Sequence, residues 1–378
     1  MKPGISLLLL ALLMPAHALG EADYLALERE GTLLRLQGHF VDAAKIEHRL
    51  LSEFDTPVGH LFALNTIITH LTWDETDTSY DAALVRHANA TINWCEPRLD
   101  EHPRAALPNY YCGQANFALA YYHGLKGNYY KAGRAGTASI EYLEKALAGD
   151  PSLVDAKMHL GVSYYVADNL PPFIKMFSRL LWFVPSGNSE KSLPYLRDVI
   201  AEGNQYKDVA KYIYATLLLE DPALRTEAQA QLQNLVGLYP ENKRFQLRLI
   251  SVLMMQDDYE GTLNAVSAYL DSDTPPIEPD LSLAKIWLVR AYMGLKQVDL
   301  ANATFAETDK VFEVSADELP GWSVAWHKLT DGQLNDLAQN REQARAIYEE
   351  ILEIAKSTYV NEVIIEAARA GLLSPYSL

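Results

Sequence analysis

The chain has 378 residues, of which 49% are hydrophobic and 21% charged, and its formal net charge is −17 at pH 7. So acidic a chain lacks the basic surface that nucleic acids or anionic membranes bind through bulk charge, and we expect no nucleic-acid partner. The hydrophobic fraction is sufficient for a large core. A chain of this length normally forms two or three globular domains, unless it is an array of repeats.

Residues 1–18 have the pattern of a secretory signal peptide. A lysine stands near the start, residues 5–14 are almost all apolar, and 16–18 offer a small-x-small cleavage site. The apolar run is shorter than the about 20 residues that span a bilayer. The first cysteine is Cys95, so no residue near the cleavage site can carry a lipoprotein anchor. We therefore expect export, cleavage and no lipid anchor.

The chain has two cysteines, Cys95 and Cys112. In an exported protein, an even number of cysteines favours a disulfide. Pro97 and Pro103 lie between them and predict a turn joining two antiparallel helices, which would bring both cysteines to a similar height. We expect a Cys95–Cys112 disulfide that stabilises the fold by about 3 kcal/mol. Two free buried thiols are the alternative.

Strand patterns are nearly absent, whereas helical periodicity recurs throughout. The most informative segment is IEYLEKALAGDPSLVDAKMHLGVSYY, in which Ala146 precedes Pro151 by five residues. Leu160, Gly161 and Tyr164 then lie on a new helix. This pattern resembles the tetratricopeptide repeat (TPR), a 34-residue helix–turn–helix unit in which a small residue precedes a proline and the next helix carries L-G-x-x-Y. The small residues allow close helix packing, and the bulky ones fill the gaps between repeats.

The same pattern recurs along the chain. Partial matches are Gly38, Phe40, Ala43 and Leu50, then Pro240, Leu249, Leu253, Tyr259 and Val266, then Leu288, Tyr292, Ala301 and Phe305, and finally Gly332, Ala344 and Tyr348. Their recurrence predicts an all-α, right-handed solenoid that resembles exported bacterial TPR proteins. The predicted organisation is degenerate helix pairs over 19–150, a repeat array over 151–358, and a capping helix with a tail over 359–378.

An unusually apolar segment, NLPPFIKMFSRLLWFVPSGNS, interrupts this array. The expected helices around it are 154–166 before it and 188–202, 206–220 and 223–238 after it. Counted back from Pro240, these helices alternate as the first and second helices of repeats only if residues 167–187 are an insertion. In the alternative register, the segment is an ordinary second helix with Phe177 at the aromatic position of the family and Pro185 at its proline position.

An inserted helix over 171–184 would be about 21 Å long, too short for the about 30 Å of a bilayer's hydrocarbon. Exposing its eight large apolar side chains to water would cost on the order of 15 kcal/mol. It could therefore cover the concave face as core, dock a protein partner, or lie in a membrane interface as a peripheral contact. The surface residues that we single out are Phe173, Phe177, Leu181 and Trp182.

No catalytic or metal-binding motif is evident, since G-x-S-x-G, H-E-x-x-H, P-loop and C-x-x-C patterns are all missing. We expect no enzymatic activity, cofactor or metal. In the TPR family, exposed positions on the first helix of each repeat contact extended peptides or partner helices. The resemblance places such positions at Tyr165, Arg248, Ser251, Trp287, Arg290 and Met293. The two arginines indicate an acidic ligand, unless they pair with neighbouring Asp and Glu side chains.

The sequence thus predicts a periplasmic, non-enzymatic scaffold or adaptor that binds other proteins in the bacterial cell envelope. The alternative is a small-molecule or lipid-binding protein in which helix 171–184 covers an apolar pocket.

Overall fold

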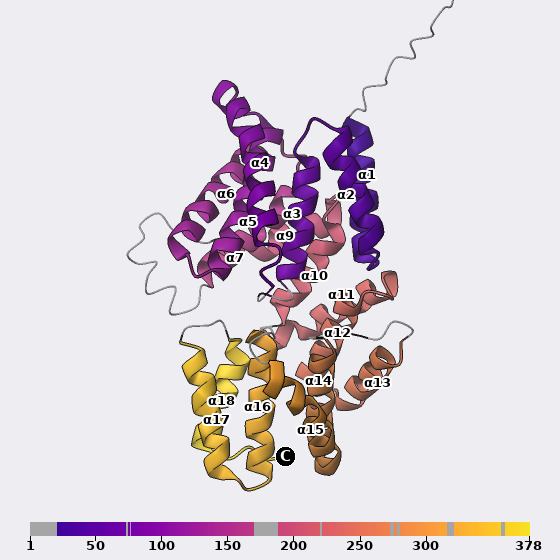
Figure 1. Cartoon of the computed structure of the whole chain (residues 1–378), viewed down its shortest axis with the longest axis vertical. Helices are drawn as coiled ribbons and strands as arrows, with labels where there is room; N and C mark the ends of the chain where they lie inside the picture. Colours follow the sequence, from indigo (N-terminus) through magenta and orange to yellow (C-terminus); the bar gives the residue numbers. More distant parts are fainter. Residues whose placement is uncertain are drawn as a thin grey trace, which may run out of the picture.

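The computed structural model contains 17 α-helices and one short 3₁₀ helix, with no strand in the part of the chain that it describes (Figure 1). The described residues are 21–72, 75, 77–169, 188–219, 221–272, 276, 278, 280–315, 321–356 and 360–378. The predicted signal peptide, most of the predicted insertion, and Phe173, Phe177, Leu181 and Trp182 lie outside these ranges.

The helices follow one another along the chain with short connections. Their bounds are α1 Glu21–Leu36, α2 Phe40–Glu53, α3 Val58–Leu71, α4 Asp81–Glu101, α5 Ala106–Leu125, α6 Tyr129–Gly149, α7 Ala156–Asp168, α9 Ser189–Glu202, α10 Lys207–Leu218, the 3₁₀ helix Pro222–Leu224, α11 Arg225–Leu238, α12 Lys243–Met255, α13 Tyr259–Leu270, α14 Asp280–Gly294, α15 Val298–Ser315, α16 Gly321–Leu337, α17 Arg341–Ile354 and α18 Glu362–Leu373. Helices α9, α10 and α11 coincide, within a few residues at each end, with three of the helices that the sequence predicts.

Consecutive helices form antiparallel pairs, and the first helix of one pair also packs against the first helix of the next. The pairs are α1/α2, α3/α4, α5/α6, α7/α9, α10/α11, α12/α13, α14/α15 and α16/α17. Contacts between α1 and α3, α3 and α5, α12 and α14, and α14 and α16 form an inner layer. Helix α18 packs on α16 and α17 at the end of the array. The all-α repeat-like architecture is therefore confirmed.

One turn geometry recurs between the two helices of a pair. A residue with positive φ ends the first helix at Gly38, Gly127, Asp257, Lys296 and Gln339. In each case the amide of the positive-φ residue donates to the carbonyl of the residue three positions earlier. The amide of the following residue donates to the carbonyl five positions before its own. This left-handed helix end satisfies carbonyls that the helix itself leaves unpaired. The turn after α5 belongs to this set, although the TPR-like pattern is weak in that part of the sequence.

Helices α7 and α9 pack directly on each other, although residues 170–187 separate them in the chain. The Ser192 hydroxyl donates to the Gly161 carbonyl at 2.7 Å, and Lys157 forms an ion pair with Asp198 at 2.6 Å. A Cβ at Gly161 would lie only 3.1 Å from the Ser192 carbonyl oxygen, so a larger residue would push the helices apart. Helices α7 and α9 thus form a pair. The helix count in the sequence predicts this pairing for the two helices that flank the insertion. The insertion itself remains a prediction.

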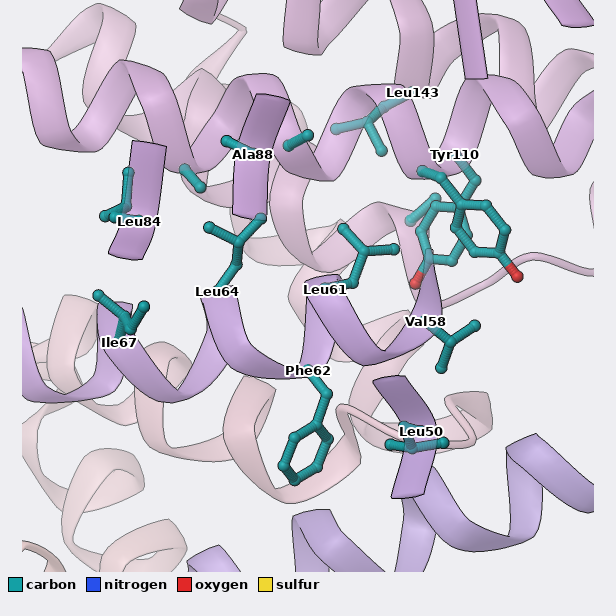
Figure 2. Packing of buried hydrophobic residues seen from close by; sticks show 14 of the residues in the cluster. Leu50, Val58, Leu61, Phe62, Leu64, Ile67, Leu84, Ala88, Tyr110 and Leu143 are labelled. Atoms are coloured by element: carbon teal, nitrogen blue, oxygen red, sulfur yellow. The ribbon is translucent and has the colours of Figure 1, made fainter. Parts of the chain in front are cut away.

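The core is continuous along the array. One cluster of buried side chains runs from α1 to α7, a second from α7 to α12, and a third from α12 to α18. In the first cluster, α3 presents Val58, Leu61, Leu64 and Ile67 to its neighbours, and Phe62 points to another side of the helix (Figure 2). Because α3 is buried on several sides, it belongs to the inner layer.

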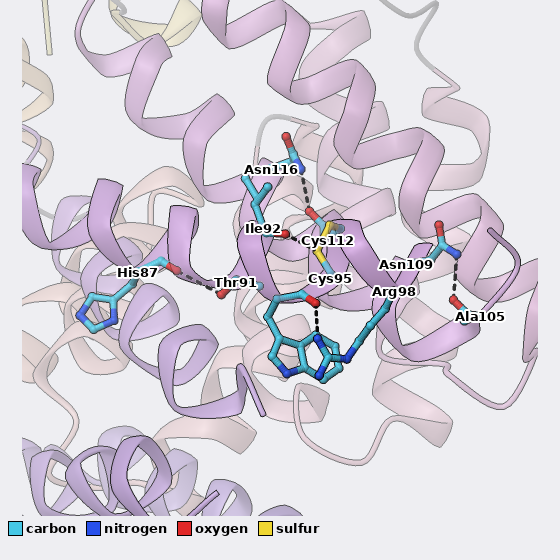
Figure 3. Close-up of a disulfide and its surroundings, with 10 residues drawn as sticks. His87, Thr91, Ile92, Cys95, Arg98, Ala105, Asn109, Cys112 and Asn116 are labelled. Atoms are coloured by element: carbon cyan, nitrogen blue, oxygen red, sulfur yellow. Dashed lines mark hydrogen bonds between the residues drawn. A yellow bond between two sulfur atoms is a disulfide. The ribbon is translucent and has the colours of Figure 1, made fainter. Parts of the chain in front are cut away.

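Cys95 on α4 and Cys112 on α5 form a disulfide, as predicted, with their Cα atoms 6.0 Å apart (Figure 3). Both side chains are fully buried. The break between the helices is shorter than predicted, because α4 continues through Pro97 to Glu101. The disulfide therefore joins two helices that already pack on each other.

The α11–α12 connection and the start of α12 reach the ends of α1 and α3. The Asn242 side chain donates to the Leu36 carbonyl at 2.8 Å, and Arg244 Nη1 donates to the Thr69 carbonyl at 2.6 Å. In Figure 1, the C-terminal end of α1 lies just above α11, where the group of helices α1–α10 meets the group α12–α18. None of the helices within the described ranges is long and apolar enough to cross a membrane.

Candidate functional site on the inner helices

The six residues that the repeat resemblance singles out lie on first helices of pairs: Tyr165 on α7, Arg248 and Ser251 on α12, and Trp287, Arg290 and Met293 on α14. Their surroundings divide them into two groups. Ser251, Trp287 and Met293 are buried, with exposed fractions of 4%, 2% and 1%. Tyr165, Arg248 and Arg290 are half-buried. The second group keeps side-chain surface that is exposed to solvent in this structure.

The burial of Ser251 and Trp287 has a clear cause. The Ser251 hydroxyl donates to the Leu247 carbonyl of its own helix at 3.0 Å. Trp287 packs edge-on against Trp326 of α16, with ring centroids 4.7 Å apart. Such aromatic contacts between neighbouring inner helices stabilise the stacking of repeats. Repeat position alone did not predict this burial.

Arg248 lies against α10. Its guanidinium is 5.9 Å from the centroid of the Tyr212 ring, and Nη2 donates to the Tyr212 hydroxyl at 3.5 Å. The Nε atom is buried without a hydrogen-bond partner in the described part of the chain. No carboxylate within the described ranges reaches ion-pair distance of this arginine.

Arg290 lies against α16 in a similar way. Its guanidinium is 5.0 Å from the Trp326 ring centroid, and Nη1 donates to Gln333 Oε1 at 2.8 Å. Burial lowers the pKa of Arg290, an effect that Tyr376 and Tyr259 partly oppose. No described carboxylate forms an ion pair with it.

Among the described residues, neither arginine is at ion-pair distance from an Asp or Glu side chain, and the Asp257 charge acts on Arg290 only from beyond that distance. A half-buried guanidinium that contacts only an amide and aromatic rings keeps donors suited to a carboxylate or phosphate. Arg248 and Arg290 lie on neighbouring inner helices, α12 and α14, that contact each other. Because Arg248 faces α10 and Arg290 faces α16, each is a separate candidate contact point for an acidic ligand.

A feature that the sequence did not indicate lies beside Arg290. The residues after α18 return to α14 and α16, where the Tyr376 amide donates to Asp336 Oδ2 at 2.8 Å. The Asp336 side chain is fully buried and also accepts bonds from Arg341 at 2.9 Å and from the Tyr348 hydroxyl at 2.9 Å. The available sequence signal for this feature was Asp336 itself. It lies three residues before the turn at Gln339, at a position that is apolar in α12 and α14.

A polar cluster fills the centre of the N-terminal half. The Tyr206 hydroxyl, at the start of α10, accepts a bond from Asn65 of α3 at 2.7 Å and donates to Gln114 of α5 at 3.1 Å. The Asp155 carboxylate at the start of α7 accepts the backbone amides of residues 204–206, at 3.1 to 3.3 Å. Four inner helices that are distant in sequence are thus joined by hydrogen bonds.

Helix α1 supplies a buried acid and a buried base to this cluster. Arg35 donates to Thr66 of α3 at 3.1 Å and to Thr32 at 3.2 Å, and it lies over the Phe62 ring at 4.4 Å. Burial raises the pKa of Glu28 to about 7, although Gln205 and Arg35 favour its charged form. Glu28 and Arg35 are seven residues apart on one helix face, a spacing from which the cluster could have been suspected.

The histidines do not form a metal site with acidic or sulfur ligands. In the part of the chain that the structure describes, no group of three or more His, Cys, Asp or Glu side chains could hold a metal ion. His60 and His87 contact each other through their Nδ1 atoms at 2.9 Å, and burial lowers the pKa of His87 to about 4. His159 packs edge-on against Phe117 and Tyr206, and burial lowers its pKa to about 3.

Comparison with models of known protein families gave no match, and a comparison with curated proteins gave none either.

Proposed function

We propose that the chain is an exported, right-handed solenoid of TPR type that acts as a non-enzymatic scaffold or adaptor, binding other proteins in the bacterial cell envelope. The all-helical array and its recurring left-handed turns support the repeat assignment. The predicted signal peptide and the buried Cys95–Cys112 disulfide support export to an oxidising compartment.

The observation that carries the proposal is the pair of half-buried arginines on adjacent inner helices. Arg248 and Arg290 each contact an aromatic ring and no described carboxylate. Arginine and aromatic side chains are the residues most often found at the energetic centre of protein interfaces. The chain has a net negative charge, so an acidic segment of a partner is attracted to these two positive groups and repelled by much of the remaining surface.

The test is photo-crosslinking in cells through p-azidophenylalanine in place of Tyr212, which contacts Arg248. The matched control carries the same group in place of Tyr130, which is 53% exposed on α6. We expect Tyr212 to capture one protein that Tyr130 does not. Replacing both Arg248 and Arg290 by glutamine should lower that capture about tenfold, since each loses a charge-assisted hydrogen bond.

Two results would contradict the scaffold. Capture that is insensitive to the two glutamine substitutions would show that the arginines do not bind the partner. Lipid or small-molecule adducts without any protein would favour the pocket-binding alternative.

A further inference from the structure

The five residues after α18, Ser374 to Leu378, form neither a helix nor a strand. Helix α18 ends at Leu373, and Ser374 has the extended dihedrals φ −141° and ψ 141°. The backbone then turns back from α18, and the end of the chain lies beside the lower ends of α16 and α15 (Figure 1). The segment therefore crosses earlier repeats instead of continuing the array.

Its central residue is held by both a polar and an apolar contact. The Tyr376 amide donates to the Asp336 carboxylate at 2.8 Å. The Tyr376 side chain packs against a buried cluster made by α14, α15 and α16, of which Val289, Met293 and Leu334 are three members. We call these three residues, with Asp336 and Arg290, the tail site.

The attachment is small and local. The Ser374 amide caps α18. Among the described hydrogen bonds, one other joins residues 374–378 to the rest of the chain, namely the bond from Tyr376 to Asp336. Leu378 is 40% exposed and Leu373 is 87% exposed. A segment held by one backbone bond and one aromatic side chain opens locally far more readily than the core.

Asp336 in the tail site is also held by contacts that do not involve the tail. Asp336 is fixed by Arg341 and by the Tyr348 hydroxyl, independently of Tyr376. A buried carboxylate aimed at a backbone amide, beside an apolar patch, is complementary to an extended chain that carries an aromatic residue.

We propose that the tail site is a peptide-binding site and that residues 374–378 occupy it as an internal ligand. The partner that replaces them is an extended protein segment with an aromatic residue in the place of Tyr376. It also carries an acidic residue that reaches Arg290. None of the side chains in SPYSL is acidic, so no side chain of the tail forms an ion pair with Arg290. This proposal rests on the scaffold function and names the kind of segment that it recognises.

The test uses the tail as a separate peptide. A fluorescein-labelled peptide of residues 371–378 is titrated with the full chain and with a chain shortened to end at Leu373, and anisotropy reports binding. We expect the peptide to bind the shortened chain at least about tenfold more tightly, because a tethered tail competes at a high effective concentration. The control peptide carries Tyr376→Ala and should bind neither.

A second peptide tests the acidic residue. The peptide with Ser377→Glu should bind the shortened chain several-fold more tightly than the natural sequence, and this gain should disappear in the Arg290→Gln variant. Equal affinities of the two peptides would overturn the role assigned to Arg290.

Two outcomes would overturn the proposal as a whole. One is that the natural peptide binds neither chain, which would make the tail a structural clip only. The other is equal binding to both chains, which would place the peptide at another site. If the shortened chain loses helical structure, the full-length Tyr376→Ala variant replaces it, since it releases the tail without removing residues. Failure here would leave the crosslinking result at Tyr212 unaffected, so the two proposals fail separately.

Discussion

Glu28 provides the most direct test of how the N-terminal half is held together. It is 8% exposed on α1, and burial raises its pKa from the ordinary 4.5 to about 7. The folded chain therefore keeps the proton on this carboxyl to a higher pH than the unfolded chain does. The contribution of Glu28 to folding stability is therefore greatest below pH 4.5, falls as the pH rises toward 7, and is constant above that range.

The difference between 4.5 and about 7 corresponds to about 3 kcal/mol, because one pH unit is worth about 1.4 kcal/mol. Glu28→Gln removes the charge and keeps the shape of the side chain. At pH 8 we expect this variant to be up to about 3 kcal/mol more stable than the natural chain. At pH 4.5 the difference should be close to zero.

The assay is urea unfolding followed by far-ultraviolet circular dichroism at pH 4.5, 6, 7 and 8, at constant ionic strength. Amide hydrogen exchange of α1 detects the same effect if the first helix unfolds before the rest. Glu30→Gln is the matched control, since Glu30 is exposed on the same helix. A Glu28→Gln difference that does not vary with pH, or a loss of stability at pH 8, would refute the reasoning.

Three further changes test the packing of the array. Replacing both Cys95 and Cys112 by serine should lower the free energy of unfolding by about 3 kcal/mol, and a reducing agent should have the same effect on the natural chain only. Gly332→Ala should destabilise by about 1–3 kcal/mol, because its Cβ would lie 2.6 Å from the Tyr348 ring. Gly237→Ala, with nothing within 4 Å of its Cβ, should instead stabilise α11 by about 1 kcal/mol. Equal effects of the two alanines would show that the contact with Tyr348 is unimportant.

The sequence by itself determined the local features of this protein. Helix periodicity gave α9, α10 and α11 within a few residues at each end, because an amphipathic helix reflects which of its faces is buried. The even cysteine count and the turn between the two cysteines gave the Cys95–Cys112 disulfide. Each of these depends on residues that are close in the chain, where spacing alone constrains geometry.

Only the tertiary structure decided which inner residues reach the surface. Trp287 and Met293 occupy positions where the repeat resemblance implies exposure, yet both are buried, Trp287 between neighbouring inner helices and Met293 in the cluster that Tyr376 packs against. The bond from Asn242 to Leu36 spans 206 residues, and the bond from Tyr376 to Asp336 spans 40. Such contacts depend on the curvature of the array, which sums small rotations between successive repeats. No local sequence pattern specifies these summed rotations. The contact of Asn242 with Leu36 and the position of the tail are therefore set only when the whole chain has folded.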